Sequence, residues 1–153
     1  MHLPRLALLS LLGLSSILST GCNTSTQPAA VGKVSKVFVR DVAASSLHST
    51  DTLANAVHDA EVRALTSRGY TVVASEGEAE ATLRSSWHTQ KGTGNRASES
   101  DVSLSVGLFD KSNRRLFTGS SGPGVPANFW NDSRATSEVN AILKGLPEPA
   151  AKK

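Results

Sequence analysis

The stretch "DVSLSVGLFDKSNRRLFTG" (Asp101–Gly119) carries the clearest structural signal in this chain. In its first half, apolar residues alternate with small ones; the apolar residues are Val102, Leu104, Val106 and Leu108. Strict alternation predicts a β-strand with one buried face and one solvated face. The polar "DKSN" (110–113) then predicts a turn, and "RRLFTG" (114–119) predicts a returning strand. The stretch therefore predicts an antiparallel β-hairpin.

Further strands are predicted on the N-terminal side of this hairpin. The segment "EATLRSSWH" (80–88) alternates in the same way and predicts a third strand of the meander. Two shorter segments rich in β-branched residues, "KVFVRDV" (36–42) and "YTVVA" (70–74), predict two more. The sequence thus predicts a mostly antiparallel sheet of four to five strands with one apolar face.

Two segments have helical periodicity. Between residues 52 and 68 the apolar residues recur every three or four positions, and Gly69 then predicts a C-terminal stop. A second helix is predicted to begin near Asp132 or Ser133; its apolar stripe consists of Ala135, Val139, Ile142, Leu143 and Leu146. The order of elements is β-α-β-β-β-β-α. We expect a two-layer α+β domain with both helices packed on one face of the sheet, because each helix has one apolar stripe to bury.

The N-terminus is organised as an export signal. Arg5 precedes Leu6–Leu18, a Leu-rich run without charge, and small residues follow up to Gly21. This layout predicts a secretory signal peptide over residues 1–21. A membrane-spanning helix needs roughly 20 apolar residues, so the run is too short to be one.

Cys22 directly follows this leader and is the only cysteine in the 153 residues. The sequence "LSTGC" (18–22) resembles the lipobox of bacterial lipoproteins, with Ser19 at the position where that family usually has Leu. The resemblance implies cleavage between Gly21 and Cys22 and attachment of lipid to the thiol. Two or more acyl chains hold a protein stably on a membrane. In enteric lipoproteins an Asp after the lipidated cysteine retains the protein in the inner membrane, so Asn23 implies the outer membrane, with the domain facing the periplasm.

Two alternatives to the lipid anchor remain open from the sequence. The small residues before Cys22 also suit the ordinary signal peptidase, which would release a soluble periplasmic protein with a free thiol. Cys22 could instead form a disulfide with a second chain. A single cysteine excludes a disulfide framework within the chain, so the domain depends on its hydrophobic core.

The length of the chain suits one domain. Removal of residues 1–21 from the 153 leaves 132. The small, polar segment 22–32 predicts a flexible tether, residues 33–147 the folded domain, and residues 148–153 a tail. Without Arg5 the mature chain has 15 basic and 13 acidic residues, spread along the sequence. We therefore expect no nucleic-acid partner, because such binding needs clustered basic residues.

Three segments resemble a family of small Gram-negative outer-membrane lipoproteins that carry a domain of unknown function. The segments are "ALTSRGYTVVASEGEAEATLRSSW" (64–87), "VSLSVGLFDKSNRRLFTG" (102–119) and "EVNAILKGLPEP" (138–149). The first strand departs from the family, since "VFVRDV" stands where a Tyr-Trp pair is common. The resemblance implies the same β-α-β-β-β-β-α order after a signal and lipobox, and it implies no reaction.

The sequence contains no recognisable catalytic or metal-binding pattern. His48, His58 and His88 lack the i,i+4 spacing of a helical metal pair, and no serine lies in a G-x-S-x-G motif. We therefore expect no metal, no cofactor and no enzyme activity. The alternative from a different class is a small periplasmic hydrolase that uses His58 with Asp59 or Glu61.

Phe129 and Trp130 lie next to each other between a Pro/Gly-rich loop and the second helix. They suit a hydrophobic staple. They also suit a surface that binds another envelope protein or a glycan, because aromatic side chains dominate such contacts. The sequence thus predicts a lipid-anchored, periplasm-facing envelope lipoprotein with a non-catalytic binding module. The alternative within the same class is an accessory subunit of an envelope assembly or secretion machine.

Overall fold

The computed structural model describes residues 24–26, 28–42, 51–92, 95 and 99–149. Its strands are β1 (Thr24–Thr26), β2 (Lys36–Val39), β3 (Thr71–Val73), β4 (Ala81–Lys91), β5 (Ser100–Asp110), β6 (Arg115–Ser120) and β7 (Val125–Pro126). Its helices are α1 (Pro28–Val31), α2 (Asp51–Ser67) and α3 (Asp132–Leu143), with two short 3-10 helices, η1 (Glu76–Glu78) and η3 (Ala127–Phe129). All the predicted elements are present, and β1, α1 and β7 were not predicted.

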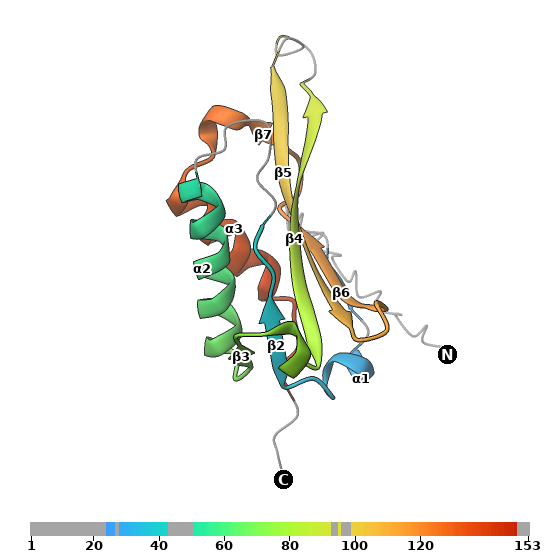
Figure 1. The fold of residues 1–153 in the computed structure, drawn as a ribbon. Coiled ribbons are helices and arrows are strands. Elements are labelled where there is room, and N and C mark those ends of the chain that lie inside the picture. Colours follow the sequence, from blue (N-terminus) through green and yellow to red (C-terminus); the bar gives the residue numbers. More distant parts are fainter. Residues whose placement is uncertain (1–23, 27, 43–50, 93–94, 96–98, 150–153) are drawn as a thin grey trace, which may run out of the picture.

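The strands form one mixed sheet in the order β1-β6-β5-β4-β2-β3, with β7 paired to β5. β2 runs parallel to both β3 and β4, and the other pairs are antiparallel. β4 and β5 pair along their whole length, from Ala81 opposite Asp110 to Lys91 opposite Ser100. This hairpin extends beyond the helices (Figure 1). The prediction of an α+β, mostly antiparallel fold is confirmed, although the sheet has seven strands instead of four to five.

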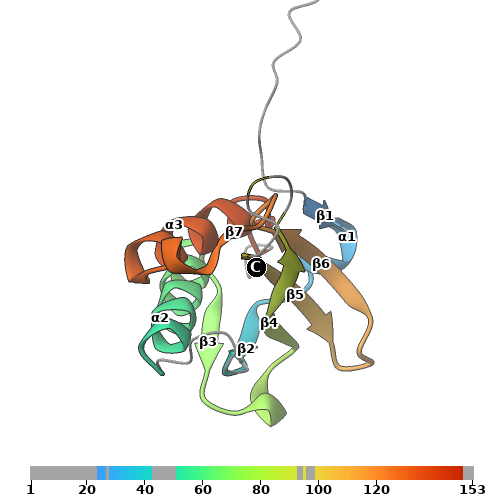
Figure 2. The same cartoon turned by 90° about the horizontal axis from the view of Figure 1, so that it is seen from above.

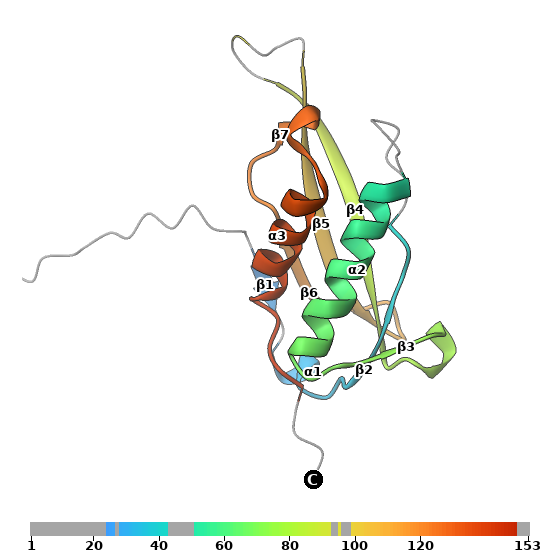
Figure 3. The same ribbon diagram turned by 90° about the vertical axis from the view of Figure 1, so that its left-hand side faces the viewer.

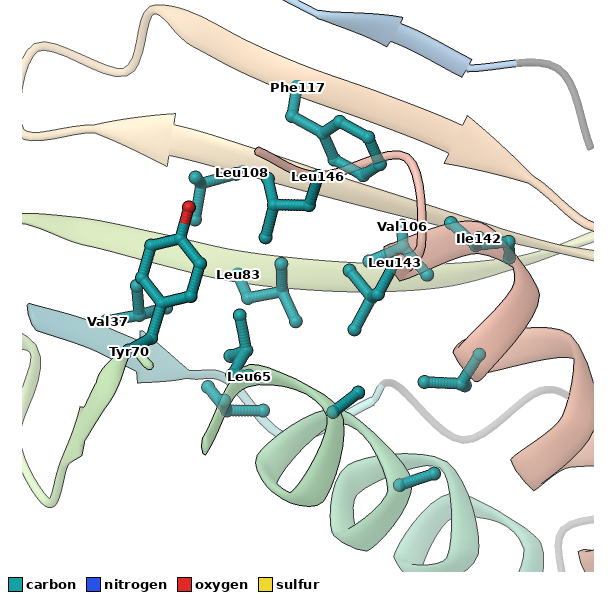
Figure 4. Close-up of a cluster of buried hydrophobic side chains, with 14 of the residues drawn as sticks. Val37, Leu65, Tyr70, Leu83, Val106, Leu108, Phe117, Ile142, Leu143 and Leu146 are labelled. Atoms are coloured by element: carbon teal, nitrogen blue, oxygen red, sulfur yellow. The ribbon is translucent and has the colours of Figure 1, made fainter. Parts of the chain in front are cut away.

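Both long helices cover the same face of the sheet and pack side by side, as Figure 2 and Figure 3 show. The alternation in β5 determines which face is covered, because Val102, Leu104, Val106 and Leu108 are all buried. Ser103 and Ser105, on the opposite face, remain partly exposed. Figure 4 shows the core between the layers; its labelled members are Val37, Leu65, Tyr70, Leu83, Val106, Leu108, Phe117, Ile142, Leu143 and Leu146.

The ends of the helices follow local sequence rules. After α2, Gly69 adopts a left-handed conformation with φ of 88°. Its amide donates to the carbonyl of Thr66, and the amide of Tyr70 donates to the carbonyl of Leu65. This pattern is a Schellman motif, which confirms the predicted stop at Gly69. α3 begins where predicted, because the Asn131 side chain accepts a hydrogen bond from the amide of Arg134 at 2.9 Å.

The folded domain begins earlier than the sequence predicted. Residues 24–26, within the segment expected to be a flexible tether, form β1 and pair with β6 in the register Thr24 to Gly119 and Thr26 to Phe117. Residues 28–31 form α1, and Val31 is completely buried in the core. The prediction of a tether over 22–32 is therefore wrong for these residues. The reason is that β6 is the outermost strand of the meander, and its free edge can accept one more strand.

The C-terminal segment closes the domain near the predicted boundary. Leu146 is fully buried, and the Tyr70 hydroxyl donates to the carbonyl of Pro147 at 2.6 Å. The Arg68 guanidinium also donates to the carbonyl of Leu146. These contacts fix the chain after α3 against the end of α2.

Candidate functional site

The two predicted aromatic residues occupy different environments. The Trp130 ring meets the Trp87 ring edge-to-face, with 4.7 Å between centroids, and its Nε1 donates to the Val102 carbonyl at 3.1 Å. The Arg134 guanidinium lies 5.7 Å from the Trp130 ring centroid. Trp130 therefore holds the start of α3 against β4 and β5. Phe129, in contrast, is 59% exposed and is the only large hydrophobic residue so exposed among those described.

The face of the sheet opposite the helices carries a network of charged and polar side chains. The Arg40 guanidinium donates to both Glu76 oxygens at 2.9 Å, and the Thr82 hydroxyl donates to Glu76 at 3.0 Å. These hydrogen bonds hold the pKa of Glu76 below its usual value. Arg84 lies 3.9 Å from Glu76 and donates to the Asn113 side chain at 2.6 Å. The network thus ties η1 to β4 and to the β5–β6 turn.

A pocket of about 320 Å³ lies beside this network. Its charged lining includes Glu76, Arg84, Asp110 and Lys111. Glu76 is already satisfied by Arg40 and Thr82, and Asp110 accepts hydrogen bonds from the Ser112 and Arg114 amides. Both carboxylates of this pocket are therefore already hydrogen-bonded to other protein groups. The pocket lining defines no single class of ligand.

Of the residues of the hydrolase alternative, His58 lies near Asp59 at the surface, and Glu61 is buried apart from both. The carboxyl of Glu61 is completely buried between α2 and the sheet, where one oxygen accepts a hydrogen bond from the Ser85 hydroxyl. The other oxygen, Oε2, has no partner among the described atoms. His58 instead lies near two surface carboxylates, 3.8 Å from Asp59 and 3.9 Å from Asp41. No hydrogen bond or ion pair joins His58 to Glu61 within the described part of the chain.

The burial of Glu61 is a feature that the sequence analysis missed. Burial raises the pKa of this carboxyl to about 8, and the Ser85 hydrogen bond opposes the shift. A signal was present in the sequence, because Glu61 follows Val57 by four positions and belongs to the same helical stripe. The charge of a glutamate favours a surface position, whereas the spacing of Glu61 from Val57 favours a position in the core.

Neither a metal site nor a membrane-spanning helix is found in the described residues. No group of three or more His, Cys, Asp or Glu side chains in these ranges could hold a metal ion. Over the same ranges, every helix is too short or too polar to cross a bilayer.

The β1–β6 edge of the sheet carries two arginines, near the end of β1 that is farther from Cys22. Gly21 and Cys22 lie outside the described residues, but Asn23 alone separates Cys22 from the first residue of β1. Beside β1 is a pocket of about 470 Å³, lined by Ser25, Thr26, Arg114, Arg115, Leu116, Phe117 and Thr118. Two arginines and no carboxylate contribute to this lining. The sequence did not predict this combination, because Arg114 and Arg115 were assigned only to the returning strand of the hairpin.

Comparison with known proteins identifies the fold. No protein-family model and no curated protein matches the sequence. PelC from Paraburkholderia phytofirmans, crystallised as a dodecamer, has a TM-score of 0.53 at 20% identity, over 86% of this chain and 98% of that one. A DUF4136 family protein from Bacteroides thetaiotaomicron has a TM-score of 0.59 at 15% identity, over 86% and 97%. The chain shares their fold. A PDZ domain protein from Parabacteroides distasonis contains it within a longer chain, with a TM-score of 0.59 at 12% identity, over 86% of this chain and 36% of that one.

Proposed function

We propose that this protein is a lipid-anchored lipoprotein of the outer membrane whose periplasm-facing domain is a non-catalytic binding module. The observation that carries the proposal is the position of Cys22, which directly follows the Leu-rich leader and stands two residues before the first strand. An N-terminal acyl anchor at this position needs no further chain to reach the domain. The chain shares its fold with the DUF4136 family protein over 97% of that protein's length. This coverage supports a single α+β domain as the module.

Phe129 is the residue that best suits partner binding within this proposal. Its side chain is exposed, while the neighbouring Trp130 fixes the backbone of η3 through its ring contact and its hydrogen bond. A large aromatic side chain on a fixed backbone loses little entropy on binding. The proposed partner is another envelope protein or a glycan.

Metabolic labelling with palmitate tests the anchor. The wild-type protein is expected to incorporate label and to sediment with outer-membrane fractions, and Cys22→Ala is expected to lose both properties. Ser25→Ala, which changes an exposed residue three positions further on, is the matched control and keeps both. Equal labelling of the wild type and Cys22→Ala would refute the anchor.

A second candidate function is a subunit of an envelope assembly. The specific observation in its favour is that PelC, which shares the fold over 98% of its own length, is a dodecamer. Native mass spectrometry of the lipidated protein in detergent tests this candidate. A discrete oligomer supports it, and a monomer at all concentrations contradicts self-assembly.

A further inference from the structure

We infer that the β1–β6 edge of the domain docks directly on the anionic headgroups of the membrane that holds Cys22. This inference rests on the proposed lipid anchor, and it goes further because it orients the domain. On this inference the domain does not move freely on a tether, and one edge of its sheet is held against the bilayer.

The first argument is the reach of the chain between the lipid and the sheet. Cys22 and Thr24 are two peptide units apart, so their Cα atoms are separated by at most about 7 Å. Thr24 is fixed opposite Gly119, and Ser25 is fixed opposite Thr118. An acylated Cys22 therefore brings the membrane surface to the start of β1, unless the three pairs of this strand are broken.

The second argument is the charge of the surface beside β1. Arg114 and Arg115 line the same pocket as Ser25 and Thr26, and no carboxylate lines it. Arg114 is 3.0 Å from Asp110, so its charge is partly balanced. Arg115 is exposed and makes no ion pair with any residue that the structure describes. Its guanidinium is thus free to bind a headgroup phosphate with two parallel hydrogen bonds.

These two observations select the same partner independently. Covalent geometry limits the distance to the bilayer, and the arginines supply a charge opposite to that of phosphate lipids. Each basic side chain close to an anionic membrane strengthens binding about five-fold, and salt screens the effect. The opposite edge of the sheet, formed by β3, lies on the far side of the domain from β1 (Figure 2).

The test measures thiol accessibility in the full lipidated chain. Lipidation blocks the only natural cysteine, so an introduced cysteine can be labelled selectively. Ser25→Cys reports on β1, and Thr71→Cys on β3 is the matched control, since both residues are exposed. Each lipidated variant is placed on vesicles containing about one anionic lipid in four. Its rate of reaction with an uncharged maleimide is compared with that of the same variant carrying Cys22→Ser, free in solution.

We expect the thiol at position 25 to react at least about five-fold more slowly on the vesicles, while the thiol at position 71 reacts equally fast in both states. Arg115→Glu or high salt is expected to restore most of the rate at position 25. Lys91→Glu makes the same charge change at the far end of the β4–β5 hairpin and is expected to have no effect.

The outcomes separate this inference from the function on which it rests. An equal rate at position 25 on the vesicles and in solution, with Cys22 shown to be acylated by mass spectrometry, would overturn the docking and leave the anchor intact. Protection at position 25 that Arg115→Glu does not relieve would overturn the role of the arginine. A Cys22 without acyl chains would remove both the docking and the anchor.

Discussion

Among the titratable side chains that the structure describes, Glu61 is the one whose pKa is shifted most by burial. Its pKa is raised to about 8, against an ordinary value of 4.5 that applies when the chain is unfolded. Between these two pH values the folded protein keeps a proton that the unfolded chain has lost. The free energy of unfolding therefore falls as the pH rises through this window, and it levels off above pH 8.

This linkage predicts the pH dependence of stability. Between pH 5.5 and pH 8, the wild-type protein should lose roughly 3 kcal/mol more stability than Glu61→Gln, whose amide cannot ionise. Urea denaturation at several pH values measures the difference. Glu78→Gln, a change at an exposed glutamate of η1, should follow the wild type. If the free energy of unfolding changed with pH in the same way for the wild type and Glu61→Gln, the buried carboxyl would not titrate as described.

Phe129 and Trp130 should separate binding from stability. Trp130→Ala should destabilise the fold by roughly 2–4 kcal/mol, because it removes the ring contact with Trp87 and the hydrogen bond to Val102. Phe129→Ala should change the unfolding free energy by less than about 0.5 kcal/mol and should reduce crosslinking to partners in intact envelopes. Unchanged crosslinking in Phe129→Ala would exclude this side chain as a binding residue.

Among the elements, α2 ends at a residue that requires a left-handed backbone. Gly69→Ala should destabilise the protein by about 1 kcal/mol, since an L-residue is strained at φ of 88°. Gly77→Ala in η1 is the matched control, because an added Cβ there meets no atom within 4 Å. Thermal unfolding of both variants tests the prediction. Equal midpoints would mean that the turn relaxes without cost.

The elements that could be predicted are those whose signal is local. The alternation of β4 and β5, and the apolar stripes of α2 and α3, each extend over many residues, so the pattern alone identifies them. β1 and β7 have two or three residues each and exist through pairing with β6 and β5. No local pattern specifies such pairing. For residues 22–32 only the small, polar composition was informative, and that composition predicts a tether.

The candidate site was predictable only in part. The pair Phe129 and Trp130 was evident as an aromatic cluster, but only the tertiary structure shows that Trp130 is packed and that Phe129 is exposed. The arginines beside β1 could not be recognised from the sequence, because about ninety residues separate them from Ser25. Their proximity depends on the β1–β6 pairing.

For the molecule as a whole, the important relation is between the sheet and the proposed lipid site at Cys22. One edge of the sheet begins two residues after Cys22, and the two long helices cover a single face. The opposite face remains polar, with Ser103 and Ser105 partly exposed. A domain anchored at Cys22 as proposed would present defined surfaces to the periplasm, which suits a binding module better than a free tether would.

Intact-mass spectrometry of the protein purified from the envelope tests the anchor most directly. The expected mass is that of residues 22–153 plus the acyl and glyceryl groups of a lipoprotein N-terminus, and alkaline hydrolysis should release the ester-linked chains. A mass equal to that of the unmodified chain starting at Cys22, or at any other residue after the leader, would contradict both the lipid anchor and the orientation inferred from it.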